Sequence, residues 1–141
     1  IKETALDNKY TQQFKKGSLE MVLLSLIYTK ETYGYELISN LNETGGKIFG
    51  YTREGTIYPL LYRLQDNGLI QSRMAPSPAN GGMKKYYSIT EKGTETLLEM
   101  VQYWDEYVSC VNSFVELVER SENTDDAAPI HKKCKQKTSS A

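Results

Sequence analysis

Apolar residues recur at helical spacing in the first part of the chain, which predicts short amphipathic helices. The first follows Ser18, a suitable N-cap residue, and the second follows Thr32 and ends at Gly45 and Gly46. The apolar positions of these two helices are Leu19, Val22, Leu23, Leu26 and Ile27, then Leu37, Ile38 and Leu41. We expect both helices to bury these faces in one core. The polar residues 1–14 predict an N-terminal arm or a short helix.

The segment REGTIYPLLYRLQDNGLI, residues 53–70, carries Pro59 within the pattern of a third helix. Gly68 suits the position after the helix, where Leu69 can close a Schellman contact. The apolar stripe consists of Ile57, Leu60, Leu61 and Leu64. Because proline lacks an amide hydrogen, regular helix either begins near Thr56, with Pro59 in the tolerated first turn, or bends at Pro59. We favour the first interpretation.

Period-two alternation in residues 70–74 and 85–89 predicts two strands. The intervening APSPANGGMK cannot continue a strand through its prolines and paired glycines, so the two strands are expected to form a hairpin with a long tip. Of the neighbours Tyr86 and Tyr87, one should pack beneath the hairpin and the other should face outward. The alternation does not decide which.

A final helix is predicted over residues 91–120, with Thr90 as its N-cap and Glu91 in its first turn. Its apolar residues follow steps of four and three, as in a heptad repeat. These residues are Leu97, Val101, Trp104, Val108, Val111, Val115 and Val118. A lone helix would expose this seam to water, so we expect it to dimerise. Residues 121–141 lack aliphatic periodicity and are expected to be a disordered tail.

Composition narrows the function classes. The chain has 141 residues, a quarter of them charged, and no apolar run near the roughly 18 residues of a membrane span, which predicts a soluble protein with no membrane partner. Two cysteines and one histidine indicate neither a disulfide framework nor a metal site, and they favour the reducing cytoplasm. We find no nucleophile–histidine–carboxylate set and no glycine-rich phosphate loop, so we expect no enzyme and no cofactor.

The net charge of −1 is unevenly distributed. Residues 1–90 contain 11 Lys and Arg against 8 Asp and Glu, whereas residues 91–120 contain 2 against 7. A polyanion responds to the local field of the face that it approaches. The first ninety residues are therefore the expected location of any nucleic-acid contact.

Three short helices followed by a two-stranded hairpin form the element order of a winged helix-turn-helix, here over residues 15–90. The expected fold is mainly α with a small β-hairpin and a long C-terminal dimerisation helix. The third helix should enter the major groove and the hairpin, or wing, should contact backbone in the minor groove. The predicted DNA-binding residues are Lys15, Lys16, Tyr33, Tyr35, Arg53, Thr56, Tyr58, Tyr62, Arg63, Asn80, Lys84 and Lys85. Solvated positions or packing at the core edge are the competing interpretations.

Four segments carry a family resemblance: FKKGSLEMVLLSL, YGYELISNL, GTIYPLLYRLQDNGLI and KKYYSITEKG. In this order and spacing they resemble the PadR family of bacterial transcriptional regulators, over residues 14 to about 120. The resemblance implies a homodimeric repressor that binds an inverted-repeat operator, often in its own promoter. A single C-terminal helix is similar to the short subfamily. Multidrug-binding members place a tryptophan that stacks planar ligands at the dimer centre in the position of Trp104, which implies that role here.

A ligand site around Trp104 would include Met100, Tyr103 and Tyr107, which lie within one helical turn. Simple packing in the dimer seam is the competing interpretation for Trp104. The acidic excess of this helix would favour cationic aromatic ligands if it lined the site. A second hypothesis for the whole chain is a winged-helix protein-interaction module that dimerises without binding DNA.

Overall fold

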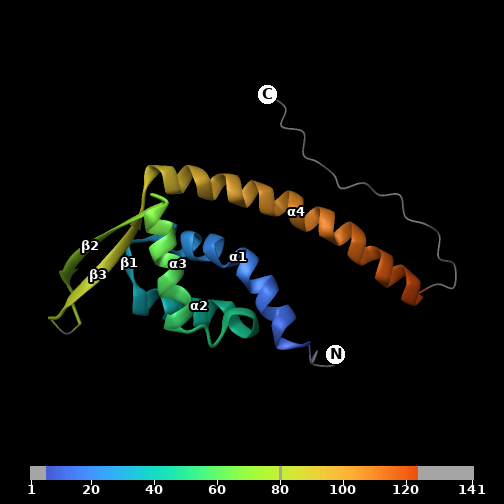
Figure 1. Cartoon of the computed structure of the whole chain (residues 1–141), viewed down its shortest axis with the longest axis horizontal. Helices are drawn as coiled ribbons and strands as arrows, with labels where there is room; N and C mark the ends of the chain where they lie inside the picture. The colour runs from blue at the N-terminus through green and yellow to red at the C-terminus, as the bar shows by residue number, and fades with distance from the viewer. Residues whose placement is uncertain (1–5, 80, 124–141) are drawn as a thin grey trace. The chain divides into compact units, whose positions relative to one another are not determined.

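A computed structural model describes residues 6–79 and 81–123 (Figure 1). Its elements are α1 (Asn8–Thr29), β1 (Thr32–Tyr33), α2 (Gly34–Phe49), α3 (Glu54–Asp66), β2 (Ile70–Pro76), β3 (Met83–Ile89) and α4 (Glu91–Asn123). The chain divides into two compact units, with the boundary between Leu97 and Leu98. The expected fold class, mainly helical with a small β component and a long C-terminal helix, is confirmed.

Helix α1 begins at Asn8, so the prediction that Ser18 caps it is wrong. The side chain of Asp7 accepts a hydrogen bond from the Lys9 amide at 3.1 Å and caps the helix instead. Ser18 lies inside the helix, where its hydroxyl donates to the Lys15 carbonyl. The polar residues ahead of Ser18 include lysines and glutamines, which are good helix formers, so the helix extends through them.

The segment before α2 forms a short third strand that the sequence did not predict. Strand β1 pairs with β3, Thr32 opposite Tyr87 and Tyr33 opposite Tyr86, and the sheet has the order β1-β3-β2. Thr32 was expected to precede α2 as its cap, but it lies in β1 instead. Its hydroxyl donates to Glu36 Oε1 at 2.8 Å. A strand of two residues is too short to show an alternating pattern.

Helices α2 and α3 end as the glycines indicate, but α3 begins earlier than expected. Gly46 has non-helical angles (φ 54°, ψ −130°), and one short helical segment follows it to Phe49. Helix α3 starts at Glu54 because the Arg53 carbonyl accepts from the Thr56 and Ile57 amides at 3.0 and 3.2 Å. Pro59 therefore lies in the second turn and not in the first.

The end of α3 and the start of α4 form one bonded junction. Gly68 has a φ of +76°, and the Leu69 amide donates to the Leu64 carbonyl at 2.9 Å, which completes the predicted Schellman motif. Thr90 caps α4 as predicted, because its hydroxyl oxygen accepts from the Gly93 amide at 2.9 Å. A Cβ at Gly93 would lie 1.9 Å from the Leu69 carbonyl oxygen, so the two segments meet closely only at glycine.

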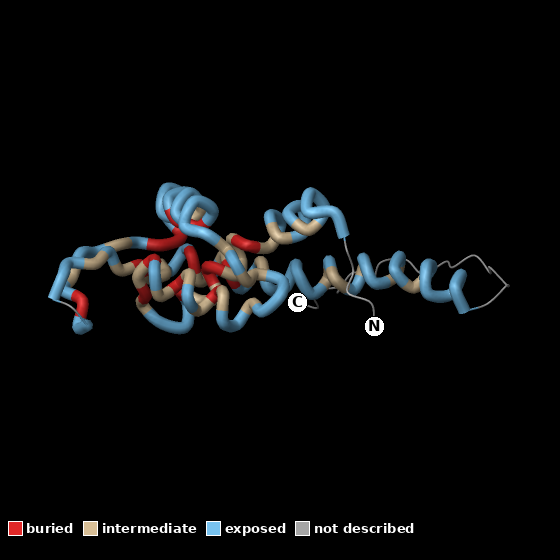
Figure 2. Tube along the Cα trace, turned by 90° about the horizontal axis from the view of Figure 1, so that it is seen from below, coloured by how far each residue is buried: buried red, intermediate tan, exposed pale blue. Residues whose placement is uncertain are grey.

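The core belongs to the first unit, which we call the winged unit. Its central side chains are at most 2% exposed, and they are Leu23, Leu24, Ile27, Leu37, Leu41, Ile57, Leu61, Leu64 and Ile70. Tyr87 is buried under the sheet and Tyr86 faces outward, which answers the question that alternation left open. Figure 2 shows the buried positions in this unit, and among the described residues after Leu97 no side chain is buried.

Candidate nucleic-acid interface

Five of the predicted DNA-binding residues surround one shallow pocket of about 140 Å³ in the winged unit. The pocket lies where the first turn of α2, the middle of α3 and strand β3 meet. Its lining consists of Tyr33, Gly34, Tyr35, Tyr58, Lys84, Lys85 and Tyr87. The fold thus brings together residues that are up to 54 positions apart in the chain, from Tyr33 to Tyr87.

Tyr58 connects the third helix to the start of α2. A Cβ on Gly34 would lie 2.4 Å from the Tyr58 hydroxyl oxygen, so a larger residue at this position would require the Tyr58 ring to move. Tyr33, the N-cap of α2, makes no side-chain capping hydrogen bond to the first amides of the helix. Such amides are ready donors to an anion. The close contact between Gly34 and Tyr58 was not identified from the sequence. The only signal for it was a glycine at the start of a helical pattern.

The two wing lysines rest on aromatic rings at the rim of the pocket. Lys84 Nζ lies 5.3 Å from the ring centroid of Tyr33, and Lys85 Nζ lies 5.7 Å from that of Tyr87. Burial raises the pKa of the Tyr87 hydroxyl, with a smaller contribution from Tyr58, so the phenol stays neutral. The pocket therefore combines two lysine side chains with phenol hydroxyl groups, a combination that suits a phosphate group.

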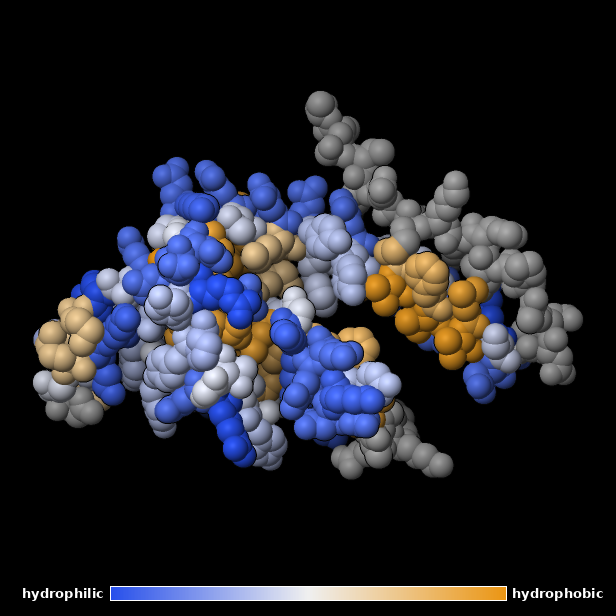
Figure 3. Space-filling view, in the orientation of Figure 1, coloured by the Kyte–Doolittle hydropathy of each residue, from blue (hydrophilic) through white to orange (hydrophobic). Residues whose placement is uncertain are grey.

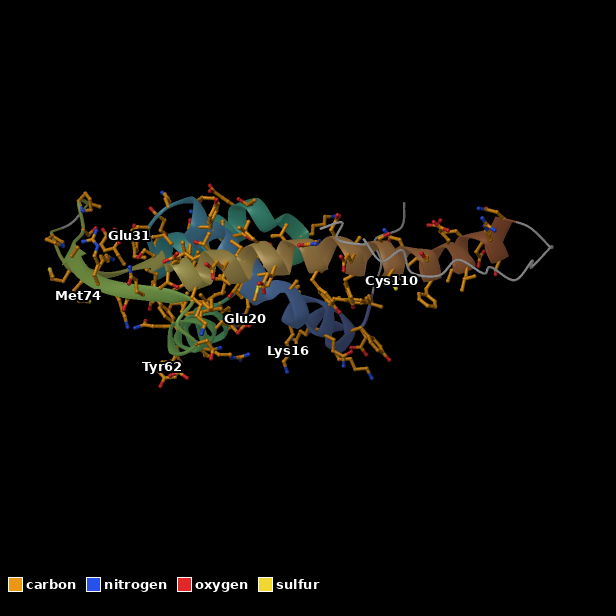
Figure 4. All side chains as sticks on the ribbon, turned by 90° about the horizontal axis from the view of Figure 1, so that it is seen from above. Lys16, Glu20, Glu31, Tyr62, Met74 and Cys110 are labelled. Atoms are coloured by element: carbon orange, nitrogen blue, oxygen red, sulfur yellow. The ribbon has the colours of Figure 1, made fainter. Side chains whose placement is uncertain are left out.

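The outward face of α3 carries further predicted residues. Arg53, Thr56 and Tyr62 are exposed, and Tyr62 is 75% exposed. Figure 4 shows Tyr62 and Lys16 of α1 pointing toward the same side of the winged unit. Lys15 is half-buried, and Asn80 lies outside the described residues.

Arg63 differs from the expectation for a DNA contact, because it is paired within the chain. Its Nη1 atom lies 3.3 Å from Glu20 Oε1 on α1. A guanidinium opposed by a carboxylate attracts a phosphate less than an unopposed one does. Arg63 stays a predicted DNA contact whose charge is partly offset by Glu20.

A second ion pair tethers the wing. Arg73 on β2 donates through its Nε to Glu31 Oε2 at 2.8 Å and through Nη2 to Glu31 Oε1. The hydrogen bond to Arg73 lowers the pKa of the Glu31 carboxyl from its usual value, and the same pair raises the pKa of Arg73. Arg73 also lies 5.4 Å from the Tyr86 ring centroid. The base of the wing is thus held to the segment before β1.

The second unit contains most of the predicted dimer seam. Val101, Trp104, Val111, Val115 and Val118 are 40–64% exposed, and Val108 is half-buried. Three further large apolar side chains of α4 are exposed: Leu98, Phe114 and Leu117. Figure 3 shows apolar side chains gathered along the later part of α4. Leu97 is the exception, because at 4% exposure it is already covered within its own chain and belongs to the winged unit.

The predicted ligand residues form an aromatic cluster on α4. The ring centroids of Tyr103 and Tyr107 lie 6.2 Å apart, and those of Trp104 and Tyr107 lie 6.1 Å apart. Met100 is half-buried on the same stretch of helix.

Two classes of site are missing from the part of the chain that the structure describes. Residues 6–79 and 81–123 contain no group of three or more histidine, cysteine or acidic side chains arranged to hold a metal ion. Within the same ranges, no helix combines the length and the apolar composition needed to cross a bilayer.

Comparison with known families and proteins gives a consistent result. The model of the transcriptional regulator PadR-like family matches residues 23–99. A PadR-like transcriptional regulator from Bacillus cereus, whose crystal structure is known, is 42% identical with a TM-score of 0.64, over 73% of this chain and 96% of that one. A Streptococcus transcriptional regulator is 41% identical with a TM-score of 0.64, over 72% and 96%. The transcriptional regulator YqjI from Escherichia coli is 38% identical over 88 residues, which are 61% of this chain and 39% of YqjI.

Proposed function

Because the chain belongs to the PadR-like family of transcriptional regulators, we propose that it is a homodimeric repressor that binds an inverted-repeat operator in double-stranded DNA. In this proposal residues 15–90 bind DNA and residues 91–120 dimerise. The observation that carries it is the pocket in which Tyr58 of α3 meets Lys84 and Lys85 of the wing. The same element order places a third helix in the major groove in other winged-helix proteins.

The pocket supports a backbone contact beside the groove. The N-terminal half of α3, with Arg53, Thr56 and Tyr58, would face the base edges and the adjoining phosphates. Tyr33, Tyr35 and the two wing lysines would hold one phosphate group at the rim. Lys15 and Lys16 on α1 would add contacts to the backbone, with Lys16 the more accessible of the two.

The exposed face of α4 supports the homodimer. Apolar patches of this kind on a helix mark protein–protein contacts in most proteins. Covering Val101, Trp104, Val111, Val115 and Val118 with a second copy would join two winged units, and a symmetric pair of these would recognise two symmetric half-sites. Half-sites about one helical turn apart, centre to centre, are the geometric expectation.

The aromatic cluster on α4 supports a planar aromatic inducer. Trp104, Tyr103 and Tyr107 would stack it at the dimer interface, and Met100 would complete the site. The inducer relieves repression only if it prefers the arrangement of the two winged units that does not fit DNA. The acidic side chains Glu99 and Asp105 on the same helix favour a cationic ligand.

Selection of bound sequences from a random pool of DNA duplexes tests the proposal directly. We expect a palindromic consensus whose affinity falls steeply with salt, as phosphate contacts require. The alternative is a winged-helix module that dimerises and binds another protein. A dimer that enriches no sequence and shows no mobility shift at low salt would establish that alternative.

The inducer site has an independent test, because Trp104 is the single tryptophan of the chain. We expect planar cationic dyes to quench its fluorescence in a saturable way and to release the selected operator at the same concentrations. Unchanged emission across a panel of such dyes would remove the ligand from the proposal and leave the DNA-binding part intact. As a regulator of transcription, the protein would act in the cytoplasm and would need no catalytic activity.

A further inference from the structure

The turn between α2 and α3 contains the most exposed large apolar side chain among the described residues. Tyr51 is 95% exposed. It is also the one residue other than glycine in those ranges that has a positive φ, +67°. An aromatic residue adopts this left-handed conformation at a cost in free energy, because its Cβ approaches the neighbouring carbonyl.

The backbone on both sides of Tyr51 is fixed by hydrogen bonds. The Gly50 amide donates to the Gly46 carbonyl at 2.8 Å, and the Thr52 amide donates to Asn42 Oδ1 at 3.1 Å. The Thr52 hydroxyl also donates to the Phe49 carbonyl. The backbone of the turn is therefore held by hydrogen bonds on both sides of Tyr51.

The fold gains little from this side chain. Across residues 6–79 and 81–123, no hydrogen bond, aromatic contact or cation–π contact involves the Tyr51 ring or hydroxyl. A glycine would adopt the same backbone without strain. A strained residue that contributes no contact to its own chain indicates a contact made outside the chain.

The position of the turn identifies that contact. Two residues, Thr52 and Arg53, separate Tyr51 from α3, and the first turn of a recognition helix is the part that approaches the duplex. Figure 1 shows this end of α3 and the tip of the β2–β3 hairpin toward the same lower side of the winged unit. A phenol at this edge would meet the sugar–phosphate backbone beside the groove, where contacts set the register of the protein on DNA.

We propose that Tyr51 is a DNA-backbone contact that fixes the register of α3 in the major groove. Its hydroxyl group donates a hydrogen bond to one phosphate oxygen, and its ring packs against the adjacent deoxyribose. This inference rests on the proposed function and adds to it a residue that neither the sequence pattern nor the pocket identified.

The test compares stability with DNA affinity in the full-length chain. Tyr51→Gly should raise the midpoint of thermal unfolding, because it removes the strain, and should weaken binding to the selected operator at least about tenfold. Tyr51→Phe should weaken binding through loss of the hydroxyl while its stability stays that of the wild type. The matched control is Tyr28→Ala, an exposed tyrosine at the end of α1 that should leave binding unchanged.

A phosphate contact by a neutral group has two further signatures. The dependence of affinity on salt should stay the same in Tyr51→Phe, because no charge is removed. A set of operators can be made in which each carries one neutral methylphosphonate in place of a phosphate. At one position this replacement should reduce the affinity of the wild type as much as Tyr51→Phe does. The same replacement should not further reduce the affinity of the Tyr51→Phe variant.

The possible failures are distinct. A Tyr51→Gly protein that is more stable and binds the operator as tightly as the wild type would overturn this inference and leave the proposed function standing. A lower unfolding midpoint in Tyr51→Gly would show that the side chain serves the fold, which also overturns it. A wild-type protein that selects no DNA would remove both proposals.

Discussion

The winged unit and the later part of α4 are built from the same apolar pattern and have opposite surroundings. In both regions apolar residues recur every three or four positions, yet Leu23 and Leu37 are fully buried, whereas Val111 and Val115 are 40% and 45% exposed. Along the seam of α4 the change occurs within one helical turn, from Leu97 at 4% exposure to Val101 at 49%. Apolar periodicity thus predicts which face of a helix avoids water. Only the fold shows whether residues of the same chain bury that face.

The two regions also differ in charge. The basic excess lies in the first ninety residues, which include the wing lysines Lys84 and Lys85, and the acidic excess lies in residues 91–120. A duplex would be attracted to the first region and repelled by the second. The division of charge therefore matches the proposed division of labour between DNA binding and dimerisation.

The largest expected effect comes from placing charge on the exposed face. Val111→Asp combined with Val115→Asp should convert the dimer to a monomer and leave the winged unit folded, because neither residue contributes to its core. Operator affinity should then fall about 10²- to 10⁴-fold, as the two half-sites no longer act together. Sedimentation velocity and a mobility-shift titration measure the two outcomes.

A matched control adds the same two charges on the polar face of α4, with Gln102→Asp and Ser109→Asp. This variant should remain a dimer and bind the operator. If it dissociates as readily as the valine variant, then general repulsion along the helix, and not the apolar face, explains the effect.

A core substitution should act differently from one on the exposed face. Leu23→Ala should destabilise the protein by about 2–5 kcal/mol, because it leaves a cavity in the centre of the winged unit. This loss should be independent of protein concentration. Val115→Ala should instead lower the thermal midpoint most at low protein concentration, because the proposed partner of Val115 is a second copy of the chain. Thermal unfolding at two concentrations separates the two regions, and identical behaviour of both variants would contradict the comparison.

The sequence predicted the elements of the winged unit well, because each helix has a wide apolar stripe and clear end signals. Gly68 and Thr90 were identified correctly, since their turn and capping chemistry is local. The predicted starts of α1 and α3 are wrong, because Asp7 caps α1 in place of Ser18 and because α3 begins at Glu54, ahead of Thr56. Strand β1 depends on its pairing with β3, which is distant in the sequence, so local pattern does not predict it.

The candidate site was predictable by residue type and less so by arrangement. Five predicted residues meet at one pocket, since exposed tyrosines and lysines at helix starts and on a wing are recognisable in sequence. The pairing of Arg63 with Glu20 joins two helices and was not visible in either segment. The left-handed backbone conformation of Tyr51 was also not predictable, because a glycine usually marks such a position in a sequence and this position holds a tyrosine.

An intermediate effect should come from the wing charges, which sharpen the electrostatic side of the comparison. Lys84→Ala and Lys85→Ala should each weaken operator binding and each reduce the slope of log affinity against log salt by about one. Lys9→Ala on α1, which removes a lysine outside the candidate interface, is the control and should leave the slope unchanged. An unaltered slope in both wing variants would mean that the wing does not touch phosphate.

The smallest expected effect concerns the surface ion pair Glu31–Arg73. It tests whether an interaction at the exposed edge of the winged unit contributes to the stability of that unit. The folded protein lowers the pKa of Glu31 below its usual value of 4.5, so the stabilisation is present above that value and is lost as pH falls through the lower folded pKa. Glu31→Gln should therefore be less stable than the wild type at neutral pH, and the difference should shrink below pH 4.5. Thermal unfolding of both proteins from pH 7 to pH 3 measures this, with Glu43→Gln on α2 as the control. A difference that persists unchanged at pH 3 would show that the glutamine disturbs packing, and that the ion pair itself contributes nothing to holding the wing.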